Sequence, residues 1–334
     1  MDKTRFIVVT SIQDYTNAVR KYANMNRWHI IYVGDKKTPS LEKFENLTLL
    51  STDQQLHLDY KIVEHCPYNH YSRKNIGYLY AMQRGASIIA DTDDDNYPYE
   101  YWDDILDYQG LVREITNSQA ANVYSLFTKE FIWPRGLPLS AVSNNVKFRL
   151  VDNYQLEKVV VWQGLVNSDP DVDAIFRLLF GPNLDVTFDF GNPVVLLQGT
   201  YSPFNSQNTF WMSEGFPLMY LPISVTFRFT DILRSYVAQC CLWAMNRKIG
   251  FTKATAYQKR NQHNLLSDFE DEIPCYLQVT RVISILKELE LSGKPFEDLA
   301  ICYEALAAES IVGENELSSV NAWIEDVIEI TVNK

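Results

Sequence analysis

Four aspartates follow directly on a short apolar run. The run Ile88–Ala90 is typical of a buried strand, and the next five residues contain Asp91, Asp93, Asp94 and Asp95. Carboxylates this close repel one another, so a positive group should neutralise them. A hard divalent cation shared with a nucleotide diphosphate meets that need, and a solvated acidic turn is the alternative. Because ligands bind at the carboxyl ends of strands in open α/β sheets, the position favours a metal–nucleotide site.

Length, charge and cysteine content limit the classes of protein. The 334 residues are 46% hydrophobic, enough for a sizeable core. The net charge of −12 argues against a nucleic-acid binder, although a bound cation would still let the site take an anionic substrate. The five cysteines show no metal-ligand spacing, which favours a reducing compartment. No apolar run reaches about 18 residues, and no signal peptide is apparent, so we expect no transmembrane segment.

The N-terminal residues predict a βαβ unit. Strands are expected at Phe6–Val9 and Trp28–Val33, with a helix between them that ends near Asn26. Small and polar residues follow each strand, where the base and ribose of a nucleotide would lie. These candidate donor-binding residues are Thr10, Ser11, Ile12 and Asp35. Neither a G-x-G-x-x-G nor a G-x-x-x-x-G-K-[ST] motif is present, which argues against a dinucleotide fold and a P-loop.

Two adjacent cations begin the helix that precedes the aspartates. Ser72 is the expected N-cap, and Ile76 and Leu79 follow at helical spacing. Arg73 and Lys74 would then lie in the first turn, where positive charge opposes the helix dipole. Such cations suit an anion bound at the helix N-terminus, so both are candidate donor-binding residues. A solvated basic pair is the alternative.

Two loops in the middle of the chain are candidate acceptor-binding segments. Trp133 and Arg135 belong to the aromatic loop Phe131–Pro138, which suits either the wall of an acceptor groove or a packed crossover. Asn205 and Gln207 belong to an amide-rich loop that would bind sugar hydroxyls or cap turns. The expected regular elements here are a helix over 97–117 and strands over 123–127, 159–165 and 225–229. Helices over Ile273–Leu291 and Pro295–Ser310 and a helical tail should follow.

Three further aspartates are candidates for acid–base chemistry. Asp169 would cap a helix whose first position is Pro170, which places Asp171 and Asp173 in its first turns. The helix dipole alone explains acids there, and sugar binding or general base catalysis is the alternative. Asp231 opens a later helix and is the second candidate base. We prefer Asp231, because Asp171 already has a structural role at a helix start.

Several blocks of sequence, in one order over about residues 67–275, resemble the STELLO glycosyltransferase-like proteins. The acidic segment is also similar to the metal-binding motif of GT-A glycosyltransferases, and Asp169–Asp173 resembles the reversibly glycosylated polypeptides, which are UDP-sugar mutases. The blocks are Tyr71–Ala81, Ile89–Asn96, Trp133–Gly136, Asp169–Leu178, Pro203–Thr209 and Phe227–Tyr236.

The resemblance implies a GT-A-like α/β fold, with a mixed sheet flanked by helices, and a UDP-sugar donor. It also implies Mn²⁺ or Mg²⁺ as cofactor. Asp95 would be the main metal ligand, Asp93 or Asp94 would lie near the ribose or the metal, and His263 would complete the metal site. Members of the family are membrane-anchored, whereas this sequence shows no anchor. We therefore expect a cytoplasmic enzyme, either free or peripheral at a membrane.

The sequence thus predicts a metal-dependent glycosyltransferase with a glycan or glycolipid acceptor. Residues 1–125 would form the nucleotide-sugar half of a GT-A domain and residues 126–275 the acceptor half. Residues 276–334 would form a helical extension through which the chain could form homo-oligomers. The alternatives are a UDP-sugar mutase and a non-catalytic partner that organises other glycan-synthesis enzymes.

Overall fold

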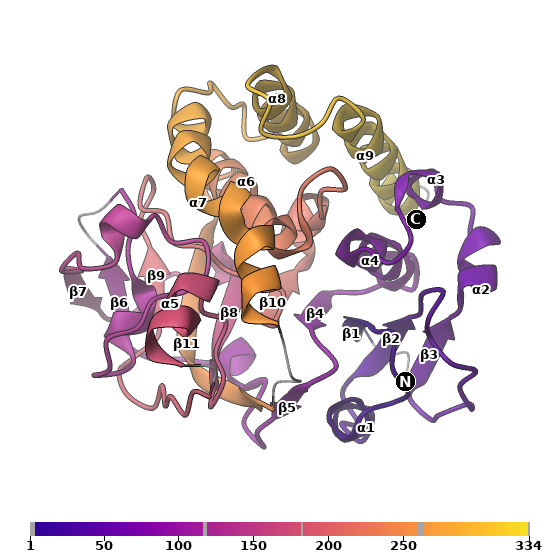
Figure 1. Cartoon of the computed structure of the whole chain (residues 1–334), viewed down its shortest axis with the longest axis horizontal. Coiled ribbons are helices and arrows are strands. Elements are labelled where there is room, and N and C mark those ends of the chain that lie inside the picture. The colour runs from indigo at the N-terminus through magenta and orange to yellow at the C-terminus, as the bar shows by residue number, and fades with distance from the viewer. Residues whose placement is uncertain (1–3, 116–118, 182, 260–263, 333–334) are drawn as a thin grey trace.

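A single mixed sheet runs through the molecule, with helices on both faces (Figure 1). The computed structural model describes residues 4–115, 119–181, 183–259 and 264–332. The sheet has eleven strands in the order β3-β2-β1-β4-β10-β8-β11-β9-β6-β7, and β5 pairs with β11 outside this path. The α/β, GT-A-like fold with C-terminal helices that the sequence predicts is confirmed.

The strands and helices have the following bounds. The strands are β1 (Arg5–Thr10), β2 (His29–Val33), β3 (Leu47–Leu50), β4 (Ile88–Thr92), β5 (Asn96–Pro98), β6 (Val112–Ile115), β7 (Phe148–Val151), β8 (Val159–Asn167), β9 (Val194–Leu196), β10 (Asn208–Met212) and β11 (Lys248–Gln258). The helices are α1 (Asn17–Ala23), α2 (Thr52–Leu56), α3 (Ile62–His65), α4 (Lys74–Gln83), α5 (Ala174–Phe180), α6 (Thr230–Ala244), α7 (Leu265–Lys287), α8 (Pro295–Ala308) and α9 (Glu316–Val332).

The N-terminal strands β3, β2, β1 and β4 are mutually parallel. Alternate residues of β1 point to opposite faces of the sheet and belong to two hydrophobic cores. Ile7 and Val9 belong to the core that contains α1, and Val8 belongs to the core that contains α4. Gly77 lets α4 approach closely, because a Cβ atom there would lie 2.6 Å from methyl groups of both Val8 and Val33. Parallel strands end at the same edge of the sheet, so the residues after β1, β2 and β4 come together.

The acidic segment (Asp91–Asp95) lies where the parallel part of the sheet meets an antiparallel strand. β10 pairs antiparallel with β4 and places Thr209 opposite Asp91. β5 follows the acidic segment at once and pairs antiparallel with the end of β11, where Asn96 lies opposite Gln258. The segment is therefore held on both sides by strands from the second half of the chain.

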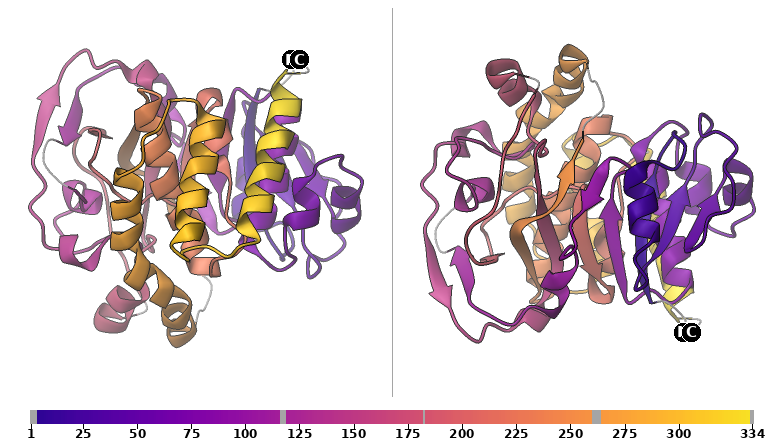
Figure 2. Two further views of the ribbon diagram at one scale, coloured as in Figure 1. Left: turned by 90° about the horizontal axis from the view of Figure 1, so that it is seen from above. Right: turned by 90° about the horizontal axis from the view of Figure 1, so that it is seen from below.

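The C-terminal helices cover the face of the sheet opposite α1 (Figure 2). α7 and α8 pack on the buried helix α6, and α9 packs on α3, α4 and α8. The Asp326 carboxylate of α9 accepts hydrogen bonds from the amides of Lys61 and Ile62, both at 2.9 Å. The last helices are thus bound to the N-terminal half. Across the described ranges, no helix combines the length and the apolar character that crossing a membrane requires.

Several of the elements expected from local sequence are wrong. The expected helix over 97–117 is not an α-helix in its described part, residues 97–115, which contains most of β5, the 3₁₀ helix Asp104–Asp107 and β6. The expected strands over 123–127 and 225–229 are instead the 3₁₀ helices Val123–Leu126 and Phe227–Phe229. Their aromatic and β-branched residues favour strands only where a neighbouring strand is available. Here β6, the preceding strand, already pairs with β7 and β9, so both of its edges are occupied.

Candidate active site

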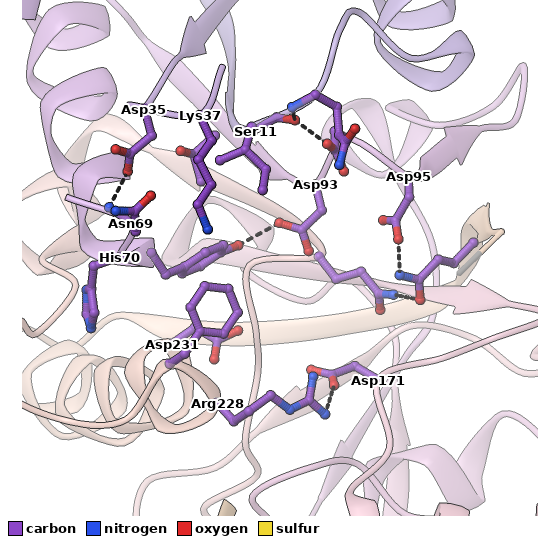
Figure 3. A pocket seen from close by; sticks show the side chains of 18 of the residues that line it. Ser11, Asp35, Lys37, Asn69, His70, Asp93, Asp95, Asp171, Arg228 and Asp231 are labelled. Carbon is purple, nitrogen blue, oxygen red and sulfur yellow. Dashed lines mark hydrogen bonds and ion pairs between the residues drawn. The ribbon is translucent and has the colours of Figure 1, made fainter. Parts of the chain in front are cut away.

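A cavity of about 450 Å³ opens at the carboxyl ends of β1, β2 and β4 (Figure 3). Residues from both halves of the chain line this cavity, called the pocket below. The predicted site residues that line it are Thr10, Ser11, Ile12, Asp35, Asp93, Asp94, Asp95, Arg135, Asp171, Gln207 and Asp231. Segments far apart in the sequence therefore meet at one site, as the sequence analysis expects.

Asp94 and Asp95 are fixed by bonds from different parts of the chain. The Ser11 hydroxyl donates to the Asp94 carboxylate, and the Thr16 hydroxyl donates to the Asp94 carbonyl. Gln258 at the end of β11 donates to Asp95 Oδ2 at 2.8 Å. Asp94 thus faces the turn after β1, whereas Asp95 faces the second half of the sheet.

Asp93 also lines the pocket, and one oxygen of its carboxylate is hydrogen-bonded. The Tyr71 hydroxyl donates to Asp93 Oδ1 at 2.6 Å, and Lys74 Nζ lies 3.4 Å from the same oxygen. Burial raises the pKa of Asp93 to about 6, although Lys74 and Tyr71 act in the opposite direction. A buried carboxylate of this kind gains stability from a nearby cation.

Asp91 lies beneath the pocket and joins two buried cations. Lys74 Nζ is 2.6 Å from Asp91 Oδ1, and an Arg234 nitrogen is 2.9 Å from Asp91 Oδ2. All three side chains are almost fully buried. Lys74 therefore supports the acidic segment from below rather than lining the pocket.

The basic pair at the start of α4 has a structural setting that the sequence analysis does not expect. The N-cap of α4 is Arg73, not Ser72. His70 caps the preceding 3₁₀ helix, Tyr71–Arg73, and accepts from the Ser72 amide at 3.2 Å. Arg73 is buried and donates to the Cys66 carbonyl at 3.0 Å and to Gln55. Neither Arg73 nor Lys74 lines the pocket, so the predicted donor-binding role of this pair gains no support from the geometry.

On the opposite wall, Arg135 lies between two aspartates. It donates from Nε and Nη2 to the two carboxylate oxygens of Asp171 at 2.8 and 2.7 Å. It also donates to Asp231 at 3.1 Å. Although burial opposes its charge, the two carboxylates raise the pKa of Arg135 well above its usual value. Asp231 additionally accepts from the Ser206 amide at 3.1 Å.

Three of the predicted acceptor residues support this wall without lining the pocket. Asn205 donates to Asp171 Oδ2 at 2.8 Å. Asp173, not Asp169, is the N-cap of α5, and its carboxylate accepts from the Phe176 amide and from Trp133 Nε1. The expectation that Asp171 and Asp173 lie in the first turns of a helix is therefore wrong. The helix starts at Ala174, and Asp169 instead pairs with Arg177, at 2.6 Å.

Comparison with known proteins agrees with this geometry. The family model described as STELLO glycosyltransferases matches residues 228–333. The Arabidopsis thaliana proteins named "Probable glycosyltransferase STELLO1" and "Probable glycosyltransferase STELLO2" are 30% and 29% identical over 98% and 97% of this chain. The chain is similar to these STELLO proteins over nearly its whole length. It spans 44% of the length of each of these two relatives.

The oxygen ligands of this STELLO-like pocket fit a hard divalent cation. Asp93 and Asp95 present carboxylates into the pocket (Figure 3), and burial raises the pKa of Asp93, an effect that a bound cation would oppose. Within the described ranges, no three histidine, cysteine or carboxylate side chains are grouped to hold a metal by themselves. A cation here would therefore need further oxygen ligands from a diphosphate and water. His263, the expected third ligand, lies outside the described residues.

The STELLO-like pocket also contains residues that sequence reasoning missed. Among these are Lys37, Tyr71, Phe227, Arg228 and Gln258. Lys37 lies two positions after Asp35, beyond the end of the same predicted strand, so it could have been predicted to line the pocket in the same way as Asp35. Gln258 reaches Asp95 only because β11 pairs with β5, and that long-range pairing leaves no local signal.

Proposed function

We propose that this STELLO-like chain is a metal-dependent glycosyltransferase that uses a nucleotide sugar, with UDP-sugars as the expected donors. The observation that carries the proposal is the meeting of three groups in one pocket. Asp93 and Asp95 can bind a metal, Asp35 and the turn after β1 can hold a nucleoside, and Asp171 and Asp231 form an acidic pair opposite them. The names of the two Arabidopsis relatives support glycosyl transfer.

The nucleoside would lie between the ends of β1 and β2. Asp35 is nearly buried and its carboxylate accepts from the amides of Lys36 and Asn69, at 2.6 and 2.7 Å. Those bonds hold it in place for the hydroxyls of a ribose. Ser11 and Ile12 border the same part of the pocket, and Ile12 is 44% exposed, so it offers an apolar contact for a base.

Asp93 and Asp95 would hold the metal ion beside the diphosphate. The ion, Mn²⁺ or Mg²⁺, would stabilise the negative charge that develops on the leaving nucleotide. Asp94 would complete the ribose side of the site, because Ser11 fixes its carboxylate.

The acceptor, a glycan or glycolipid, would enter on the side of Asp171 and Asp231. An inverting transfer needs a carboxylate within hydrogen-bond reach of the acceptor hydroxyl. We assign this role to Asp231, with Asp171 as the alternative. Trp133, Asp173 and Asn205 would fix this wall, and Gln207 would offer an amide to sugar hydroxyls from within the pocket.

Calorimetric titration with UDP, with and without Mn²⁺, tests the proposal. Wild-type protein should bind UDP more tightly with the metal, and Asp95→Ala should remove that gain. Asp107→Ala is the matched control, because Asp107 is an exposed acid outside the pocket. UDP affinity that is unchanged by Mn²⁺ or by Asp95→Ala would refute the metal site.

A further inference from the structure

We propose that Lys37 binds the diphosphate of the nucleotide-sugar donor, and this inference rests on the proposed function. Among the described residues that line the pocket, three carry a permanent positive charge: Lys37, Arg135 and Arg228. His70 also lines it, but burial lowers the pKa of its imidazole, which favours the neutral form. The question is which of these cations remains available to a phosphate.

Both arginines are already neutralised by protein carboxylates. Arg135 donates to Asp171 and Asp231, as described above. Arg228 donates from Nε and Nη2 to Glu272 Oε1 of α7, at 2.8 and 2.6 Å. A phosphate could recruit either arginine only by breaking a partly or fully buried ion pair, which is unfavourable.

Lys37 differs from both arginines in having no such partner. Its side chain is exposed and makes no hydrogen bond or ion pair with any residue in the part of the chain that the structure describes. Figure 3 shows it pointing into the pocket, between Asp35 and Asp93. Its neighbour Lys36 is engaged elsewhere, with Nζ 4.0 Å from the centre of the Tyr68 ring.

The backbone around Lys37 is fixed, although its side chain is free. The Thr38 hydroxyl accepts from the Asp35 amide and donates to the Ser11 carbonyl, both at 2.7 Å. The Thr38 amide donates to the Asp35 carbonyl at 2.8 Å. These bonds tie the loop after β2 to the turn after β1. Lys37 is therefore carried by the same rigid framework that would hold the nucleoside.

Lys37 is placed to neutralise the phosphate charge that one bound metal ion would leave uncompensated. A nucleoside diphosphate carries more negative charge than one divalent cation neutralises, so a second cation would strengthen binding. The metal ligands Asp93 and Asp95 belong to the acidic segment, whereas Lys37 reaches the pocket from the end of β2. The phosphates would then lie between the metal ion and the Lys37 ammonium group.

Binding of UDP and uridine to the full chain, with Mn²⁺ present, tests this inference. Lys37→Met should weaken UDP binding by about tenfold or more, as expected for loss of a charge-assisted hydrogen bond. Uridine affinity should not change, because uridine has no phosphate. Lys43→Met, which removes an exposed lysine outside the pocket, should leave both affinities unchanged.

The outcomes separate this inference from the proposed function. If wild-type protein binds UDP and Lys37→Met binds it equally well, the role of Lys37 is refuted and the proposed function stands. If Lys37→Met weakens uridine and UDP equally, Lys37 shapes the loop and does not bind phosphate. If wild-type protein binds no UDP under any metal condition, both proposals fail.

Discussion

The guanidinium group of Arg135 donates to both carboxylate oxygens of Asp231, at 3.1 Å each. The same group binds Asp171, so one cation holds two neighbouring acids on the acceptor wall of the pocket. All three side chains are at least nine-tenths buried. Two carboxylates could not share this wall without such a cation, because each would repel the other.

Arg135→Met should therefore destabilise the protein strongly. The variant leaves two buried carboxylates without their cation, a change that costs about 3–5 kcal/mol when a buried ion pair loses one member. Urea unfolding at neutral pH would measure the loss. Arg281→Met is the control: Arg281 pairs with Glu309 on the surface, where such pairs contribute at most about 1 kcal/mol. Equal effects of the two substitutions would contradict this account of Arg135.

Asp231→Asn should abolish sugar transfer and leave metal-dependent UDP binding nearly intact. The reason is that the amide cannot accept the proton of an acceptor hydroxyl, whereas the proposed metal ligands, Asp93 and Asp95, lie on the opposite wall. Asp171→Asn is the comparison, and it should keep transfer while losing stability, because Arg135 and Asn205 both donate to Asp171. An active Asp231→Asn variant beside a folded, inactive Asp171→Asn variant would reverse the two roles.

Tyr71→Phe should weaken metal-dependent UDP binding several-fold and cost only about 0.5–1.5 kcal/mol of stability. It removes the hydroxyl that donates to Asp93 and retains the ring that packs edge-on against Phe227. Tyr60→Phe is the matched control, because its hydroxyl bonds Gln83 away from the pocket. If both variants bind UDP and Mn²⁺ like wild-type protein, Tyr71 does not position Asp93.

The pH dependence of stability should include a contribution from Asp173. Burial raises its pKa from 3.8 to about 6, so the folded protein holds this proton more tightly than the unfolded chain. The resulting stabilisation is complete below about pH 4 and disappears as the pH rises through about 6. Asp173→Asn keeps a good N-cap residue but has no such proton.

Urea unfolding of the wild type and Asp173→Asn at pH 4 and pH 7 would reveal this contribution. From pH 4 to pH 7, the wild type should lose up to about 3 kcal/mol of unfolding free energy relative to the variant. Parallel pH profiles for the two proteins would show that Asp173 keeps an ordinary pKa in the folded state.

The features predicted best from sequence were those set by local pattern. The strand before the acidic segment, the βαβ unit at the N-terminus and the last three helices all follow from apolar periodicity. The acidic segment comes at the end of β4, whose Ile89 and Ala90 are fully buried. The apolar run before it was enough to predict that these acids lie at the edge of the sheet where the pocket opens.

The features that the structure shows differently from the sequence-based expectation depend on contacts between residues that are distant in the sequence. Arg73 and Lys74 are adjacent cations in the sequence, but both are buried and have different partners. Arg73 donates to the Gln55 amide oxygen, and Lys74 pairs with the Asp91 carboxylate. Asp173 is the helix cap, whereas Asp169 pairs with Arg177. Residues 225–229 have strand-like composition, yet they pair with no strand of the sheet. Each outcome is decided by tertiary packing, which local propensity does not encode.

UDP release from a panel of UDP-sugars, with Mn²⁺ and without added acceptor, tests the central claim most directly. Water would replace the acceptor hydroxyl, so at least one UDP-sugar should be hydrolysed slowly by the wild type. That activity should require the metal and should be lost in Asp95→Ala. A UDP-sugar whose ring form changes without UDP release would instead indicate a mutase. Wild-type protein that binds UDP but releases none from any donor, with or without glycan acceptors, would contradict glycosyl transfer and favour a non-catalytic role.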